Sequence, residues 1–106
     1  MSKLDRALVF AALGDPVRLE LLARISDGGS ITKLTADLPI TRQAVTRHLR
    51  ILERAELIVS QRNGREMRFV ARPARLIEAK GWLDDVAQQW DGTLGRLKLL
   101  VERKKT

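Results

Sequence analysis

The chain contains no cysteine and no tyrosine, and it has a single histidine, His48, among 106 residues. Without cysteine it can form neither a disulfide nor a thiolate metal site, and it has no cysteine nucleophile. A histidine-rich metal site and a Ser-His-Asp hydrolase are disfavoured by the lone histidine. No apolar run approaches the roughly 18 residues of a membrane span, and the charged N-terminus lacks a signal-peptide stretch. We therefore expect a cytoplasmic protein.

Charge is distributed unevenly along the sequence. The composition, with 44% hydrophobic and 31% charged residues, fits one globular domain over residues 1–106. The net charge is +7; residues 1–39 are neutral overall, residues 40–75 carry nine arginines and three glutamates, and residues 76–106 add +1. A basic block of this kind favours a polyanionic partner, most commonly nucleic acid. A solvated basic face without a partner would have the same composition.

Two amphipathic helices are predicted in the N-terminal third. The first covers residues 3–13 and ends at Gly14. The second begins with Asp15 as N-cap and Pro16 at the first helical position, where the missing N–H costs nothing. Gly28, followed by a second glycine, ends this helix. Its expected buried stripe consists of Leu19, Leu22, Ala23 and Ile25.

A helix-turn-helix is predicted over residues 33–55. Its first helix covers residues 33–38, with Thr32 as its cap, and its second helix is capped by Thr41. The predicted turn between them is only three residues long.

A β-hairpin is predicted next, over residues 57–71. Asn63-Gly64 between two strand-like runs is a strong hairpin signal, because both turn residues take positive φ in the favoured turn. Met67 and Phe69 alternate with polar residues, so one face of the second strand is apolar.

The second helix of the helix-turn-helix has two contrasting faces at 100° per residue. The inward face contains Ala44, Val45, His48, Leu49, Ile51, Leu52 and Ala55. The outward face contains Arg42, Gln43, Thr46, Arg47, Arg50, Glu53 and Arg54. We expect His48 to be a structural, hydrogen-bonded imidazole rather than a ligand or a catalytic base.

This outward face suits the major groove of DNA. Arginine reads guanine edges or binds phosphate, glutamine pairs with adenine, and threonine binds phosphate or touches a thymine methyl. An arginine-rich solvated helix is the alternative. The candidate recognition-helix contacts are Thr41, Arg42, Gln43, Thr46, Arg47 and Arg50. The hairpin would add contacts from Arg62, Asn63, Arg65 and Arg68, although a solvated role stays open for each arginine.

A long helix is predicted over residues 74–103, with Leu76, Leu83, Trp90 and Leu97 repeating every seven residues. Its continuity through Gly92 and Gly95 is left open. Trp82 and Trp90 favour core or interface packing, with a ligand pocket as the alternative. One small domain cannot easily cover this stripe and that of the first helix, so we expect a homodimer. The expected interface residues are Leu4, Leu8, Leu83, Val86, Trp90, Leu94 and Leu97.

Three runs of the sequence resemble the ArsR/SmtB-type repressor family. Residues 14–22, GDPVRLELL, look like the opening motif of that family. Residues 41–55, TRQAVTRHLRILERA, resemble its recognition helix, especially in members without metal sites, and residues 81–94 are similar to the last helix of that subgroup. The resemblance covers almost the whole chain. It implies a dimeric winged-helix repressor in which the first and last helices form the interface.

The chain departs from the family at two places. Glu56 stands where the family often has glycine, so this residue must be left-handed or the helix must end differently. Metal-sensing members use a Cys-x-Cys pair before the turn, or His and Asp ligands on the last helix. Residues 31–38 contain no thiol here and the last helix contains no histidine, which excludes soft-metal sensing. We expect no metal and no cofactor, with a weak carboxylate-only site as the alternative.

Together these features predict a mainly α-helical protein with a small β-hairpin, folded as a winged helix-turn-helix. Its expected function is sequence-specific DNA binding as a dimeric transcriptional repressor of an inverted-repeat operator. Two alternatives stay open: a non-specific architectural nucleic-acid-binding protein, and a protein-interaction module that acts through the last helix. An enzyme is not expected, because no nucleophile or acid–base pair is apparent.

Overall fold

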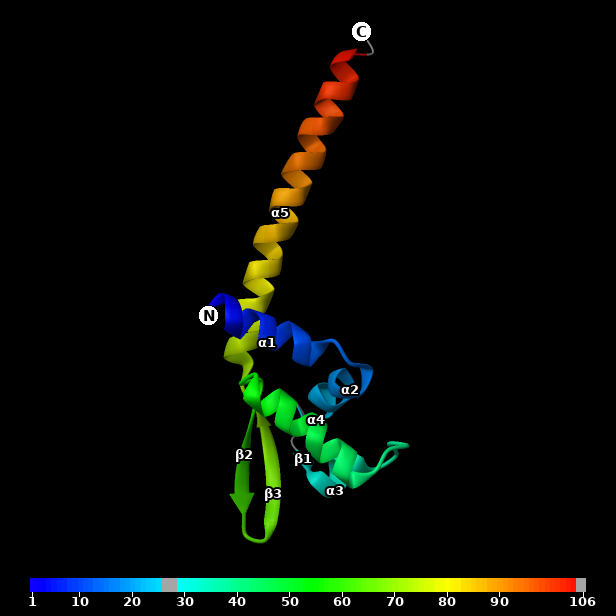
Figure 1. Ribbon diagram of the computed structural model, residues 1–106, viewed down its shortest axis with the longest axis vertical. Coiled ribbons are helices and arrows are strands. Elements are labelled where there is room, and N and C mark those ends of the chain that lie inside the picture. The colour runs from blue at the N-terminus through cyan, green and yellow to red at the C-terminus, as the bar shows by residue number, and fades with distance from the viewer. Residues whose placement is uncertain (26–28, 105–106) are drawn as a thin grey trace. The chain divides into compact units, whose positions relative to one another are not determined.

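The computed structural model describes residues 1–25 and 29–104. Its elements, in chain order, are α1 (Lys3–Leu13), α2 (Pro16–Ile25), β1 (Gly29–Ser30), α3 (Ile31–Thr35), α4 (Arg42–Arg54), β2 (Ile58–Asn63), β3 (Glu66–Ala71) and α5 (Pro73–Lys104) (Figure 1). The chain divides into two units, and the domain expected over residues 1–106 covers both: residues 1–76 hold the helix-turn-helix and the sheet, and residues 77–106 hold the rest of α5. The predicted fold class, mainly helical with a small antiparallel hairpin, is confirmed.

Side-chain caps start the first two helices. Ser2 Oγ accepts a hydrogen bond from the backbone N–H of Asp5 (3.1 Å), and Asp5 Oδ2 accepts one from the backbone N–H of Ser2 (3.0 Å). This reciprocal capping box satisfies two N–H groups at the start of α1. Asp15 Oδ1 accepts from the backbone N–H groups of Val17 (2.8 Å) and Arg18 (3.1 Å). The predicted N-cap of α2 is therefore confirmed.

The core of the first unit lies where α4 packs against α1, α2, α3 and β2. The fully buried side chains with the largest volumes are Leu21, Ile25, Leu34, Leu49, Leu52, Leu57, Ile58, Val9 and Val45. The predicted stripe of α2 is wrong in part, because Leu21 is buried while Leu19 and Ala23 are exposed. Leucines on two sides of α2 make both faces nearly equally apolar, so periodicity alone could not select the buried one. The predicted helix stop at Gly28 lies outside the described residues.

The first helix of the helix-turn-helix starts two residues earlier than predicted. Its N-cap is Ser30, whose Oγ accepts from the backbone N–H of Lys33 at 3.3 Å. Thr32, the predicted cap, is inside α3. Ser30 also pairs with Arg68 in the sheet, and this tertiary contact places the extended cap residue at position 30.

The turn between α3 and α4 is also longer than predicted. It covers residues 36–41, because α3 ends at Thr35 and Asp37 takes a left-handed conformation (φ 65°). The guanidinium of Arg24 in α2 donates to the carbonyl of Ala36 at 2.6 Å, which fixes the start of the turn. At its end, the predicted cap Thr41 is confirmed by a 3.0 Å bond from the backbone N–H of Ala44 to Thr41 Oγ1.

The C-terminus of α4 closes in a Schellman-type motif. The backbone N–H of Leu57 donates to the carbonyl of Leu52 (3.1 Å), and that of Glu56 donates to the carbonyl of Glu53 (2.9 Å). Glu56 is left-handed (φ 59°), which confirms the first of the two conformations expected at this non-glycine position. Its carboxylate pairs with Arg75, at the start of α5.

The sheet has the strand order β1-β3-β2, and both strand pairs are antiparallel. The predicted hairpin turn is shifted by one residue, because Asn63 pairs with Glu66 and the loop is Gly64-Arg65. Gly64 (φ 66°) occupies the first loop position, where glycine adopts positive φ without steric cost. The pairing of Gly29 with Phe69 was not predicted, since two residues carry no strand periodicity.

Helix α5 is continuous through Gly92 and Gly95, which answers the question left open above. Most of its apolar side chains are exposed, including Ile77, Leu83, Trp90, Leu94 and Leu97. Among the described residues, no helix combines the length and apolar character required to cross a bilayer.

The left-handed conformation of Glu56 predicts a difference between two substitutions. Glu56→Gly and Glu56→Ala both remove the carboxylate that pairs with Arg75, and they differ only in the Cβ atom. A Cβ costs about 1 kcal/mol in this backbone region, so the glycine variant should be the more stable by that amount. Urea unfolding measures the difference. Equal stability of the two variants would mean that residue 56 is not left-handed in solution.

The cap at Asp15 predicts a pH-dependent contribution to stability. The hydrogen bond from the backbone N–H of Arg18 is the largest cause that lowers the pKa of Asp15 below 3.8. Because the pKa is lower in the folded state, the contribution is complete above pH 3.8 and is lost as the pH falls through the folded-state pKa. Asp15→Ala should therefore melt below the wild type at neutral pH, and the gap should narrow in acid.

Asp15→Ser is the matched control for this measurement, because serine keeps a capping oxygen that does not titrate. Its thermal advantage over Asp15→Ala should persist across the same pH range. A gap between the wild type and Asp15→Ala that stays constant down to acid would contradict an ionised cap.

Candidate nucleic-acid interface

The polar face of α4 is exposed as predicted. Arg42, Gln43, Arg47 and Arg50 are exposed, while Thr46 is half-buried. The Thr46 hydroxyl donates to the carbonyl of Arg42 at 3.0 Å, and the Thr41 hydroxyl is engaged as the cap. Three guanidinium groups and the amide of Gln43 therefore lie on one exposed face of this helix.

The opposite face of α4 anchors it in the core. Val45, Leu49 and Leu52 are fully buried. Ile51, predicted to point inward, is 38% exposed. Glu53, predicted to point outward, is half-buried, and its carboxylate accepts from the backbone N–H of Ser60 in β2 at 3.0 Å. Because β2 follows α4 directly, this hydrogen bond holds the hairpin against the end of the helix.

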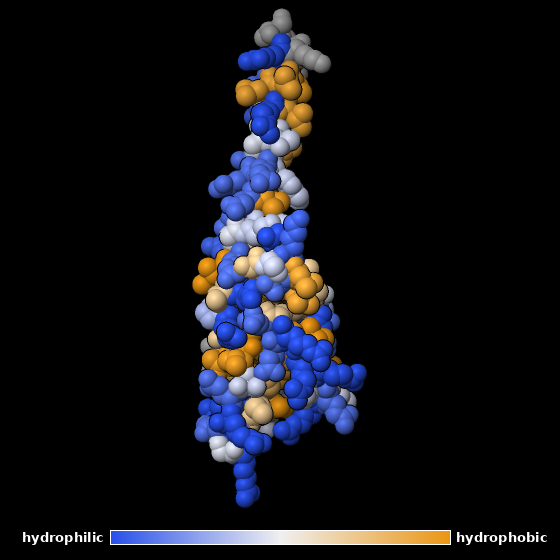
Figure 2. Space-filling model, turned by 60° about the vertical axis from the view of Figure 1, so that its left-hand side comes forward, coloured by the Kyte–Doolittle hydropathy of each residue, from blue (hydrophilic) through white to orange (hydrophobic). Residues whose placement is uncertain are grey.

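The four predicted hairpin residues, Arg62, Asn63, Arg65 and Arg68, are all exposed. Figure 2 shows mainly hydrophilic side chains toward the lower end of the view, where the hairpin lies. Glu66 lies 3.5 Å from the guanidinium of Arg68 and partly neutralises it. Arg62 and Arg65 are therefore the stronger candidates for an anionic partner on the hairpin.

A hollow of about 300 Å³ joins the helix-turn-helix to the hairpin. Arg42 at the start of α4 and Arg65 in the hairpin loop both line it, so two predicted contact residues from separate elements meet there. The other lining residues are Ile31, Thr32, Glu66 and Met67. The sequence had assigned Thr32 to a cap and Met67 to an apolar strand face. Neither assignment indicated that these residues line a hollow. The place of Thr32 there depends on α3 beginning at Ile31.

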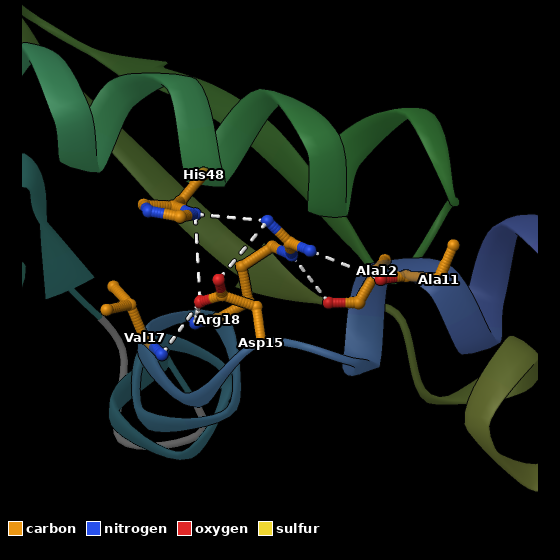
Figure 3. Close-up of polar contacts among 6 residues, drawn as sticks. All are labelled: Ala11, Ala12, Asp15, Val17, Arg18 and His48. Carbon is orange, nitrogen blue, oxygen red and sulfur yellow. Dashed lines mark hydrogen bonds and ion pairs between the residues drawn. The ribbon is translucent and has the colours of Figure 1, made fainter.

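His48 lies on the side of α4 that faces the α1–α2 junction. Its Nδ1 is 3.2 Å from Nη1 of Arg18 and 4.0 Å from Oδ1 of Asp15 (Figure 3). The expected structural, hydrogen-bonded imidazole is thus what the structure contains. Asp15, expected to act only as a cap, also has a carboxylate oxygen 3.9 Å from Arg18 Nη1.

The predicted dimer residues lie on both units. Leu4 and Leu8 are exposed on α1, and Leu83, Trp90, Leu94 and Leu97 are exposed on α5, where Val86 is half-buried. Trp90 is 70% exposed and Trp82 is half-buried. Figure 2 shows hydrophobic side chains in several places along α5.

Acidic and histidine side chains do not gather into a metal site within residues 1–25 and 29–104: no group of three or more that could hold an ion is present there. The exposed face of α4 presents the guanidinium groups of Arg42, Arg47 and Arg50 and the amide of Gln43. These groups bind phosphates and base edges.

A helix-turn-helix domain model matches residues 13–61, which include α2, α3, α4 and the start of the hairpin. The chain is 38% identical over 90 residues to the uncharacterized HTH-type transcriptional regulator YuzN of Bacillus subtilis strain 168, covering 76% of this chain and 97% of YuzN. It is 32% identical over 81 residues to the HTH-type transcriptional regulator Rv2034 of Mycobacterium tuberculosis strain H37Rv, covering 76% and 74% of the two chains.

The fold is likewise similar to that of a solved regulator. An ArsR-like transcriptional regulator from Rhodococcus sp. RHA1 superposes with a TM-score of 0.79 at 35% identity, covering 91% of this chain and 92% of that one. These relatives are transcriptional regulators and not enzymes. The chain therefore belongs to the ArsR family of winged helix-turn-helix, DNA-binding transcriptional regulators.

Proposed function

We propose that this regulator is a homodimeric repressor that binds an inverted-repeat operator, with α4 in the major groove and the β2–β3 hairpin as the wing. The observation that carries the proposal is the exposed polar face of α4, on a helix whose opposite face buries Val45, Leu49 and Leu52 completely. A helix held in this way presents Arg42, Gln43 and Arg47 to base edges in one orientation.

The wing contributes phosphate or minor-groove contacts. Arg65 shares a hollow with Arg42, so a DNA strand that reaches the start of α4 also comes within reach of the hairpin loop. Arg62 lies in the same exposed part of the hairpin. Contacts of this kind fix the register of the protein on DNA and make binding strongly dependent on salt.

The second copy follows from the exposed apolar residues of α1 and α5. Leu4, Leu83, Trp90, Leu94 and Leu97 each leave about half or more of their surface uncovered in the single chain. A two-fold partner would bury them and would place two recognition helices about 34–36 Å apart, one turn of DNA. Repression is what the family resemblance implies, because a bound dimer occupies promoter DNA.

The two alternatives predict different DNA-binding behaviour. An architectural protein would bind all duplexes alike with a steep salt dependence, and a protein-interaction module would bind none. The polar face of α4 favours sequence-specific binding over both, because Gln43 offers an amide suited to adenine that a purely electrostatic contact would not need.

Removal of Arg47 tests the recognition face. Arg47→Ala should weaken binding to a duplex selected by the wild type from a random pool by about 1–3 kcal/mol. Arg96→Ala removes the same charge from α5 and should leave that affinity nearly unchanged. Fluorescence anisotropy at fixed salt measures both. Equal effects of the two substitutions would show that Arg47 acts only through net charge.

Substitution within the apolar stripe tests the dimer. Leu83→Asp places a charge where the proposed interface is apolar, and it should yield monomers with weakened binding to the same duplex. Gln88→Asp adds the same charge away from the stripe and should leave the dimer intact. Sedimentation equilibrium gives the masses of both variants. A Leu83→Asp protein that remains dimeric would refute this interface.

A further inference from the structure

We propose that Arg18 is a positioning residue for DNA recognition: through His48 it sets the orientation of α4 relative to the end of α1 and the start of α2. This inference rests on the proposed function, because α4 is the helix assigned to the major groove. It gives a function to the GDPVRLELL motif beyond capping α2.

The guanidinium of Arg18 joins three helices. Its Nε donates to the carbonyl of Ala12 (2.7 Å) and its Nη2 to the carbonyl of Ala11 (3.2 Å), both in the last turn of α1. Its Nη1 lies 3.2 Å from Nδ1 of His48 in α4 and 3.9 Å from Oδ2 of Asp15, the cap of α2. Figure 3 shows these partners arranged around the one planar group.

Charge and geometry both select arginine at position 18. The last carbonyls of a helix have no intrahelical partner and carry partial negative charge. The last turn of α1 has no basic residue of its own, so Arg18 supplies the cation from the next helix. A guanidinium donates in fixed directions from one plane, whereas a lysine ammonium is a point charge and cannot reproduce the same set of contacts.

His48 links these contacts of Arg18 to α4, whose polar face we propose to contact DNA. Nη1 of Arg18 can only donate, so Nδ1 of His48 is the acceptor. The imidazole is half-buried at mid-helix and directly follows Arg47, so a rotation of α4 that breaks this bond also displaces the Arg47 side chain. The buried Val45, Leu49 and Leu52 attract their neighbours without strong directionality, and the hydrogen bond adds the directional restraint.

Three variants separate this role from simple stabilisation. Arg18→Lys keeps the positive charge but loses the planar set of N–H donors. His48→Leu removes the acceptor without lowering helix propensity. His48→Asn is the matched control, because its Oδ1 is the same number of bonds from Cα as Nδ1 and accepts from Arg18. The double variant of Arg18→Lys and His48→Leu completes a thermodynamic cycle.

The readout is the affinity for the duplex selected by the wild type, divided by the affinity for a scrambled duplex of equal length. Arg18→Lys and His48→Leu should each lower this ratio by about three- to thirtyfold, and the double variant should lower it no further. His48→Asn should retain most of the ratio. Affinity for the scrambled duplex should stay constant, since it depends on phosphate contacts that these variants keep.

The angle between α2 and α4 is measured independently, from residual dipolar couplings of the DNA-free protein. It should change in Arg18→Lys and His48→Leu and not in His48→Asn. An unchanged angle overturns the inference, and so does an unchanged affinity ratio or a double variant with additive losses. If Arg18→Lys fails to fold, as judged by circular dichroism, the two His48 variants decide the matter.

Failure of the proposed function gives a different result. A wild type that shows no preference among duplexes contradicts sequence-specific regulation by this face. The helix angle then decides the positioning role alone: a shift in His48→Leu that is absent in His48→Asn supports it, and no shift overturns it.

Discussion

Burial of one face of α4 is the constraint on which the other features depend. Val45, Leu49 and Leu52 are fully buried where α4 meets α1, α2, α3 and β2, and each such side chain contributes about 1.5–3 kcal/mol through removal from water. A helix that advances 100° per residue must then expose Arg42, Gln43, Arg47 and Arg50 on its other side. The residues that fill the core therefore also determine the orientation of the polar face of α4. Under the proposed function, a change in core packing would consequently alter DNA recognition without a substitution on the polar face of α4.

The two ends of α4 determine where the hairpin starts. Thr41 caps its first turn, and the left-handed Glu56 closes its last turn so that the chain reverses directly into β2. Glu53 then accepts a hydrogen bond from Ser60 in β2, and Arg75 pairs with both Glu56 and Asp5. These contacts join α1, α4, β2 and α5. The hairpin that Glu53 holds against the end of α4 carries Arg65, which lines the same hollow as Arg42.

Local chemistry predicted the features that a single residue decides. Asp15 and Thr41 cap their helices and the two faces of α4 separate largely as expected, because each depends on side-chain chemistry or helical period. Several errors occur where neighbouring residues offer equivalent signals. Ser30 and Thr32 can both cap a helix, Asn63-Gly64 and Gly64-Arg65 can both form a turn, and α2 has leucines on two sides. Partners distant in sequence determine the bounds of α3: Ser30 pairs with Arg68 in β3, and Arg24 donates to the carbonyl of Ala36, directly after the helix.

The net charge of a segment can be read from the sequence, but the ion pairs that reduce its effect are known only from the folded protein. The sequence assigns nine arginines to the basic third, and all of them enter its net charge equally. In the folded protein Arg75 is committed to Asp5 and Glu56, and Arg68 lies beside Glu66, so these two contribute less to the field that a phosphate meets. Arg18, by contrast, lies in the neutral N-terminal third, and its side chain is only 15% exposed. The positioning role that we propose for it arises from its acceptors in α1 and α4 and not from its contribution to a basic patch. Affinity for polyanions can therefore be read from composition, whereas the orientation that we propose for sequence recognition depends on individual part-buried hydrogen bonds such as those of Arg18.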